Sequence, residues 1–181
     1  VIDNAGDRAT ETSSTGGNDL VESSISLTLW SNLERLTLTG TDAITGAGNA
    51  LDNIITGNIA DNAISGGLGA DTLNGNGGND RYVYRSASES TATSRDTIAG
   101  FNAGDRIDLS AIDANSATAA NDAFTFIGSS AFSGVAGQLR AYQSGSEWIV
   151  EGDTNGDGIA DLVIGVTPAA GYALAGGDFI V

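Results

Sequence analysis

An oxygen-bearing side chain returns every nine residues along the middle of the chain. The five positions are Asn53, Asn62, Asp71, Asp80 and Glu89. A glycine lies five positions before each of the first four, and a large apolar residue lies two positions after each of them, at Ile55, Ile64, Leu73 and Tyr82. Residue types that share one period indicate a stack of short units, each a loop followed by a strand.

Loops stacked in this way can bind a metal ion. Two nonapeptides per turn stack the loop that ends at Asn53 on the loop that ends at Asp71, and this loop on Glu89. On the other side, the loop of Asn62 stacks on that of Asp80. A cation between two loops takes a side-chain oxygen from each and carbonyl oxygens from the glycine turns, the all-oxygen environment that calcium prefers. The candidate ligands are Gly66, Gly67, Gly69, Asp71, Gly75, Gly77, Gly78 and Asp80, with Asn53 and Asn62.

The same repeat also fits a metal-free β-helix, in which Asn and Asp side chains only cap turns. Asn53 and Asn62 favour this alternative locally, because a neutral amide is a weaker calcium ligand than a carboxylate. We therefore predict calcium at the Asp71 and Asp80 loops, and both alternatives stay open at the two Asn loops.

A second acidic loop near the C-terminus has oxygens at alternate positions and a glycine after the third of them, the pattern by which a short loop wraps calcium. Its twelfth position is Ile164 instead of a bidentate Glu, and the flanking segments have strand propensity. We therefore predict a calcium-binding hairpin and not an EF-hand, with a solvated Asp-Gly turn as the alternative. The candidate ligands are Asp153, Asn155, Asp157, Ile159 and Asp161.

The loops need strands to position them, and the chain divides into three segments. Residues 46–91 form the regular array, in which an 18-residue turn places successive strands on opposite sheets. The turn glycines are expected at φ > 0, where a Cβ would clash. Residues 1–45 are expected to form irregular β-helix coils. Residues 92–181 break the period and carry strand-like segments joined by Gly and Asp turns.

The fold class that follows is all-β, with a parallel β-roll or β-helix followed by a mostly antiparallel C-terminal region. Asp42 and Ile44 show the acidic-to-apolar spacing of the repeat, eleven residues before Asn53 and Ile55, which predicts a two-residue insertion. Residues 115–120 are predicted to form a short helix, and Pro168 to end the last long strand.

The composition excludes several classes of protein. Seven basic residues face 23 acidic ones, for a formal net charge of -16, which argues against nucleic acid or an anionic membrane as partner. Cysteine and histidine are both absent, which removes disulfides and the usual zinc ligand and general base. No apolar run of 18 residues predicts a membrane span, and no signal peptide is recognised at the N-terminus. We expect the chain to be a fragment of a longer protein.

Two resemblances join these observations. The nonapeptide Gly66–Asn74 is identified as an RTX (hemolysin-type) calcium-binding repeat. The chain from Gly75 onward resembles the C-terminal half of serralysin-type secreted metalloproteases. The matching segments are Gly78–Tyr84, Asp96–Phe101, Gly104–Ser110 and Asp178–Val181.

The serralysin resemblance implies further site residues and a route of export. It implies that Glu89, Asp96 and Asp105 complete the final calcium sites. It also implies secretion from a Gram-negative bacterium through a type I apparatus that reads the C-terminal tail. The repeat region would stay unfolded where calcium is scarce and fold outside the cell. For Asp178–Val181 itself, a closing strand is the alternative to an export signal.

Three functions compete. The first is a non-catalytic calcium-binding module that carries the type I secretion signal of a larger secreted protein, joined to upstream domains. The second is an ancillary domain of a metalloprotease; its His-Glu-x-x-His motif cannot lie in a chain without histidine, so catalysis would lie upstream. The third is an adhesive module that binds extracellular polysaccharide, for which Trp30 and Trp148 could serve as platforms, although a lone Trp at strand spacing is more often core. No catalytic residues are predicted.

Overall fold

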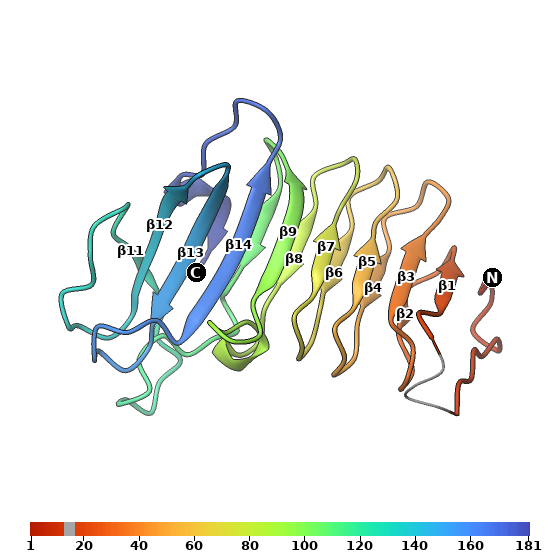
Figure 1. The fold of residues 1–181 in the computed structure, drawn as a ribbon, viewed down its shortest axis with the longest axis horizontal. Helices are drawn as coiled ribbons and strands as arrows, with labels where there is room; N and C mark the ends of the chain where they lie inside the picture. Colours follow the sequence, from red (N-terminus) through yellow and green to blue (C-terminus); the bar gives the residue numbers. More distant parts are fainter. Residues whose placement is uncertain (13–16) are drawn as a thin grey trace.

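The computed structural model describes residues 1–12 and 17–181 and shows an all-β fold of two stacked sheets (Figure 1). The larger sheet has nine strands in the order β1 (Leu20–Ser23), β3 (Arg35–Leu38), β5 (Ile54–Thr56), β7 (Thr72–Asn74), β9 (Asp96–Phe101), β14 (Leu162–Pro168), β13 (Glu147–Asp153), β12 (Gln138–Ser144) and β11 (Thr125–Phe126). The smaller sheet has six strands in the order β15 (Phe179–Ile180), β10 (Arg106–Asp108), β8 (Arg81–Val83), β6 (Ala63–Ser65), β4 (Thr45–Ala47) and β2 (Leu27–Thr28).

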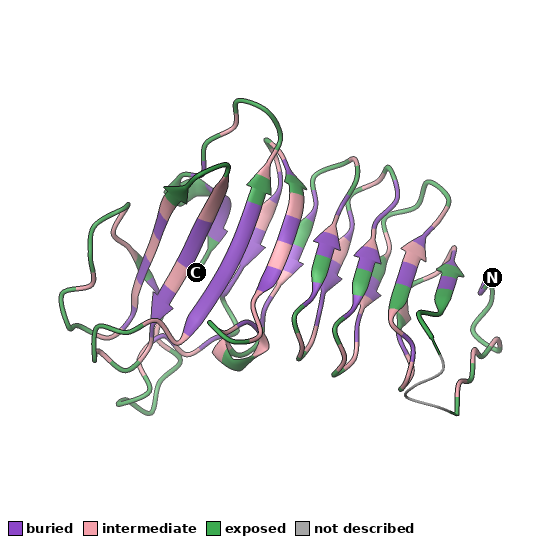
Figure 2. Cartoon of the chain, viewed as in Figure 1, coloured by how far each residue is buried: buried purple, intermediate pink, exposed green. Residues whose placement is uncertain are grey.

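The nonapeptide array forms the predicted parallel β-roll. Each unit contributes one strand of three residues, and its central side chain points into the space between the sheets. Ile55 pairs with Leu73 in the larger sheet, and Ile64 pairs with Tyr82 in the smaller one, each pair 18 residues apart. These four side chains are at most 1% exposed. The alternation of buried and exposed residues along the strands is visible in Figure 2.

The prediction of a two-residue insertion at Asp42 and Ile44 is wrong. Leu27 pairs with Gly46 and Leu36 with Ile55, each nineteen residues apart, so the extra length is one residue. Gly46 occupies the inward place because a Cβ there would already approach Leu36, Leu38 and Ile55 at 3.3–3.4 Å. Leu36, Leu38 and Ile55 fill the space beside Gly46 that the inward apolar side chain occupies in later coils.

The C-terminal region extends both sheets of the roll. β9 continues the larger sheet in parallel, and β14 pairs with it in parallel although it lies some sixty residues further along the chain. The antiparallel pairs predicted for this region are those of β12, β13 and β14, whereas β11 pairs with β12 in parallel. On the other sheet, β15 adds to β10 in parallel. Pro168 ends β14, as predicted.

Residues 115–120 form turns, so the predicted short helix is wrong. Oδ1 of Asn115 accepts the N–H of Ala117, and the hydroxyl of Thr118 donates to Asp122. The N–H of Ser116 donates to the carbonyl of Thr154. Side chains that bond to nearby backbone compete with the helical pattern, and here they prevail.

One hydrophobic core runs through all three sequence segments. Its buried residues extend from Ile2 at the N-terminal end to Phe179 at the C-terminal end. The boundaries predicted at residues 45 and 91 stay predictions, and the side chains on either side of each pack into the same cluster. In the described part of the chain, no helix has the length and apolar character needed to cross a membrane.

Candidate metal centre

Six buried side chains form two columns, one at each edge of the roll. The first column contains Asn53, Asp71 and Asp96, and the second contains Asn62, Asp80 and Asp105. In both columns, Oδ1 of each Asp accepts the backbone N–H of the residue before it in the column, at 2.7–2.9 Å. All six residues are at most 2% exposed. The stacking of successive loops thus brings side-chain oxygens that are far apart in sequence into the same column.

The prediction that Glu89 follows Asp71 in the stack is wrong. Residues 85–95 leave the roll and form a loop with the short 3-10 helix η1 (Ala87–Glu89), so the next strand begins at Asp96. Glu89 lies beside the column, where its Oε2 accepts the N–H of Arg85 at 3.1 Å. Its negative charge still contributes to raising the pKa of Asp71 and of Asp96. A role for Glu89 as a calcium ligand stays a prediction.

Several buried carboxylate oxygens in the columns have no hydrogen-bond partner. They are Oδ2 of Asp71, Asp80 and Asp96. Burial raises the pKa of Asp71 to about 7, of Asp80 to about 6 and of Asp96 to about 8. The burial that raises these values makes the ionised form costly unless a positive charge compensates it. Free carboxylate oxygens in an all-oxygen setting fit a hard divalent cation such as calcium.

The loop glycines are required for two different reasons, and the prediction named only one. Gly67 and Gly78 have φ values of 100° and 106°, in the left-handed region where a side chain is strained. Gly66 and Gly75 do not have positive φ. A Cβ on Gly66 would lie 2.0 Å from Oδ2 of Asp71, and a Cβ on Gly75 would lie 2.0 Å from Oδ2 of Asp80. The carboxylates therefore occupy the space that a side chain would fill.

Gly66→Ala is expected to destabilise the calcium-loaded protein by about 1–3 kcal/mol, because the added methyl group displaces the carboxylate of Asp71. Gly77→Ala is the matched control in the following loop, since its Cβ would meet nothing closer than 3.7 Å and its φ is not positive. That change should stay within about 0.5 kcal/mol. Urea unfolding in excess calcium measures both, and equal losses would contradict the assigned geometry.

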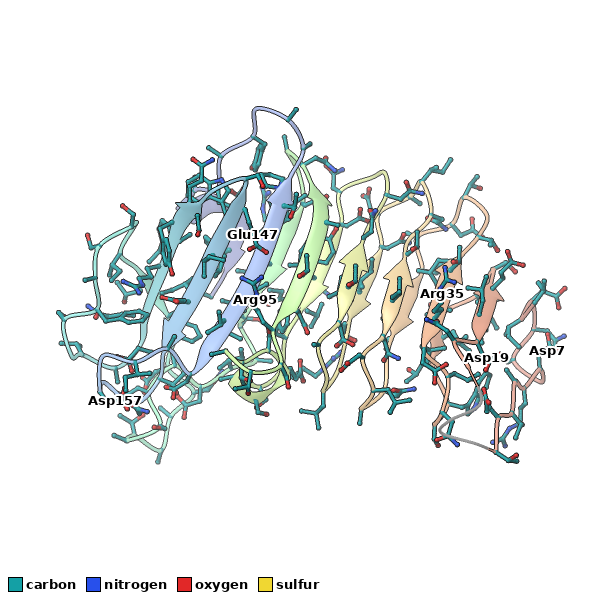
Figure 3. All side chains as sticks on the ribbon, in the orientation of Figure 1. Asp7, Asp19, Arg35, Arg95, Glu147 and Asp157 are labelled. Carbon is teal, nitrogen blue, oxygen red and sulfur yellow. The ribbon has the colours of Figure 1, made fainter. Side chains whose placement is uncertain are left out.

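The C-terminal acidic loop is a hairpin, as predicted. It joins β13 to β14, which pair antiparallel, and Asp157 lies exposed in it (Figure 3). Asp153 is buried, and its carboxylate accepts the N–H groups of Asn155, Gly156 and Gly158 at 2.6–3.2 Å.

The carboxylate of Asp161 is also engaged in this loop. Oδ2 of Asp161 accepts both the N–H and the hydroxyl of Thr154, and Oδ1 accepts from Nδ2 of Asn155. The carboxylates of Asp153 and Asp161 are thus satisfied by the loop itself, and Oδ1 of the exposed Asp157 accepts the N–H of Ile159. The column carboxylates with a free oxygen are Asp71, Asp80 and Asp96. Calcium at Asp153–Asp161 stays a prediction.

The C-terminal segment closes the smaller sheet. Phe179 pairs with Ile107 as β15 joins β10. Asp178, at the end of the short helix η2 (Gly176–Asp178), is 5% exposed and accepts the hydroxyl of Tyr172 at 2.6 Å. It also lies 3.8 Å from Arg106. The closing strand is therefore present in the structure, and the export signal stays a prediction.

Two residues at the first column were not singled out from the sequence. Tyr84 is 1% exposed, and burial, together with the negative charge of nearby Asp96, raises the pKa of its hydroxyl well above the usual value. Ser90 accepts the N–H of Asp96 at 2.9 Å and donates to the carbonyl of Val163 in β14 at 2.6 Å. Ser90 therefore links the column to the C-terminal hairpin. The one sequence signal for the role of Ser90 is its position directly after Glu89, a residue of the nine-residue period.

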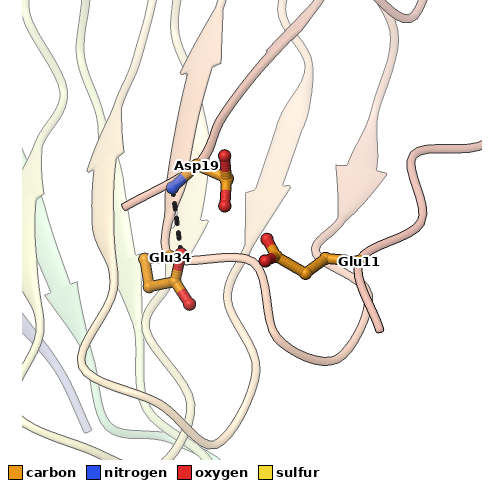
Figure 4. Close-up of side chains that lie close together, drawn as sticks. All are labelled: Glu11, Asp19 and Glu34. Carbon is orange, nitrogen blue, oxygen red and sulfur yellow. Dashed lines mark hydrogen bonds between the residues drawn. The ribbon is translucent and has the colours of Figure 1, made fainter. Parts of the chain in front are cut away.

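A cluster of carboxylates at the N-terminal end was also not predicted. Glu11, Asp19 and Glu34 lie close together, and Oε2 of Glu34 accepts the N–H of Asp19 at 3.0 Å (Figure 4). Among the described residues, it is the one group of three acidic side chains whose ligand atoms all lie within 4.8 Å of one another. Its members are exposed or half-buried, unlike the column carboxylates, so their charges are solvated without a cation.

Both tryptophans pack against the hydrophobic core. Trp30 lies beside it at the N-terminal end of the roll, and Trp148 lies on β13. This agrees with the expectation that a lone Trp at strand spacing is more often core than a sugar platform. Polysaccharide binding stays a prediction.

Comparison with known proteins identifies a family. A family model described as peptidase M10 serralysin C terminal matches residues 13–181, which is nearly the whole chain. No curated protein matches the chain at a significant level.

Proposed function

The chain belongs to the peptidase M10 serralysin C-terminal family, and from this premise we propose that it is a non-catalytic calcium-binding module that folds on calcium binding outside the cell. Domains of this family are ancillary to a catalytic part that lies elsewhere, and they bind calcium. Serralysin-type proteins are secreted by Gram-negative bacteria.

The observation that carries the proposal is the set of buried carboxylate oxygens without partners. Asp71 and Asp96 would hold calcium in the first column, with Glu89 beside them. Asp80 and Asp105 would hold it in the second column. The glycine loops 66–69 and 75–78 would contribute carbonyl oxygens. Calcium would supply the positive charge that these buried carboxylates lack.

Calcium would also oppose the self-repulsion of the chain. A formal net charge of -16 on 181 residues disfavours a compact state until cations neutralise part of it. One site stabilises the folded state by about 2.7 kcal/mol when calcium is a hundredfold above its Kd. Two or more such sites are comparable with the whole stability of a typical domain, about 5–15 kcal/mol. Calcium concentration can therefore decide whether the chain is folded.

The second part of the proposal is export by a type I apparatus that reads the C-terminal tail. Asp178 and Phe179 are buried in the folded protein whereas Ile180 and Val181 are exposed, so the segment as a whole is accessible only when the chain is unfolded. A low calcium concentration inside the cell would keep it so. Folding would then follow export, when calcium fills the two columns. The module would serve a larger secreted protein whose catalytic or adhesive part lies upstream.

Calorimetric titration of the calcium-free protein tests the binding directly. We expect calcium to bind with more than one equivalent, and magnesium to bind far more weakly, because magnesium demands a tighter octahedral geometry. Absence of calcium binding, or equal binding of magnesium, would contradict the proposal. The same titration after Asp153→Asn shows whether the hairpin loop takes one of the ions.

A further inference from the structure

The first two loops of the array, residues 48–53 and 57–62, are closed by side-chain amides. Oδ1 of Asn53 accepts the backbone N–H of Asn49 at 2.7 Å. Nδ2 of Asn53 donates to the carbonyl oxygens of Leu33 and Glu34 in the preceding coil, at 3.1 and 3.3 Å. The amide therefore satisfies its own loop and the coil before it at the same time.

The second loop repeats the arrangement at the other edge of the roll. Oδ1 of Asn62 accepts the N–H of Asn58 at 2.8 Å, and Nδ2 donates to the carbonyl of Ile44 at 3.1 Å. Asn58 adds a further bridge, because its own Nδ2 donates to the carbonyls of Thr39 and Asp42 at 3.2 and 3.0 Å. Asn49 makes the equivalent pair of bonds to its preceding coil. We call these two loops the closed loops.

The next two loops, residues 66–71 and 75–80, differ in backbone conformation. Gly67 and Asn76 take the places of Asn49 and Asn58, with φ values of 100° and 74°, whereas Asn49 and Asn58 do not have positive φ. The corresponding N–H does not bond to the carboxylate, and Oδ2 of Asp71 and of Asp80 has no partner. We call these two loops the open loops.

The difference follows from what each side chain can offer. An amide has both donors and acceptors, so it can bond to an N–H of its own loop and to carbonyls of the preceding coil. An ionised carboxylate only accepts hydrogen bonds, so it cannot form one with a nearby carbonyl oxygen. A cation can bind carboxylate and carbonyl oxygens at the same time. In the closed loops, the NH2 group of the Asn side chain already donates to the carbonyl oxygens.

We propose that Asn53 and Asn62 lock the closed loops without a cation, so that calcium binding in the array begins only at Gly66. The inference rests on the proposed calcium function, and it divides the array into loops that bind calcium and loops that do not. The coils before Gly66 would form a metal-independent part of the roll, on which the calcium-dependent part stacks. The choice of Asn or Asp at one position would specify which kind of loop forms.

Calcium stoichiometry at saturation, by equilibrium dialysis, tests the boundary. Asn53→Ala and Asn62→Ala should leave the number of bound ions unchanged, although both should melt at a lower temperature because they lose buried hydrogen bonds. Asp71→Ala is the positive control and should lose calcium. A smaller number of bound ions in either Asn variant would overturn the proposal.

Hydrogen exchange on the calcium-loaded wild-type protein provides a second test that needs no variant. The backbone N–H groups of Asn49 and Asn58 should be strongly protected, because they donate to the buried side chains of Asn53 and Asn62. Fast exchange at both positions would overturn the amide lock. If the protein binds no calcium at all, the proposed function fails, while the exchange rates still decide the lock.

Discussion

Removal of calcium is expected to unfold most of the two-sheet structure. Without a cation, the column carboxylates, Asp71, Asp80 and Asp96 among them, remain buried with free oxygens, and the negative charge of the chain is not compensated. The β-sheet signal in far-ultraviolet circular dichroism should lose most of its intensity in excess chelator and recover in excess calcium. Magnesium at the same concentration should not restore it.

Tryptophan fluorescence can follow the two ends of the molecule in the same experiment. Trp30 and Trp148 both pack against the core, near opposite ends of the roll. Trp30→Phe and Trp148→Phe each leave one reporter, so the emission shift of each half can be titrated against calcium. A β-sheet spectrum unchanged by chelator would contradict the calcium-dependent fold, whatever the fluorescence shows.

Asp71→Asn and Asp80→Asn are expected to remove most of the stabilisation that calcium gives at each column. The change keeps the size of the side chain but removes the charge and places an NH2 group where a free oxygen lies. At a hundredfold excess of calcium over the wild-type Kd, the loss should be about 2.7 kcal/mol for each site abolished. Thermal unfolding with and without calcium measures the difference.

The same coils provide matched controls in Asp52 and Asp61. Both are exposed, and their Oδ1 atoms accept the N–H groups of Ala70 and Asn79 at 2.8 and 2.7 Å. An Asn oxygen can accept the same bonds, so Asp52→Asn and Asp61→Asn should leave the calcium-induced stabilisation unchanged. If the four variants lose calcium stabilisation equally, net charge and not the columns explains the effect.

The periodic part of the fold could be predicted because it depends on local repetition. Each of Ile55, Ile64, Leu73 and Tyr82 must point inward once the unit is a loop and a short strand, and the structure confirms all four. The irregular part could not be predicted in the same way. Residues 85–95 leave the stack, and no nine-residue pattern distinguishes Glu89, which leaves with them, from Asp96, which rejoins it.

The pairing of strands that are far apart in the sequence was the second feature that could not be predicted. β14 lies between β9 and β13 because it pairs in parallel with the former and antiparallel with the latter. Ser90 supports that position by bonding to Val163, 73 residues away. Such contacts depend on which strand edges remain free once the roll has formed, and no local propensity encodes that.

The sequence by itself determined that this chain is a nonapeptide β-roll with a serralysin-like C-terminal region, because period, glycine placement and residue type are local properties. Only the tertiary structure decided which oxygens share a column and which of them lack partners. Asn53 and Asp71 occupy the same place in the repeat, yet one is satisfied and the other is open. The reason is that the stack places carbonyl oxygens of the preceding coil beside this position, and an amide can donate to them whereas a carboxylate cannot.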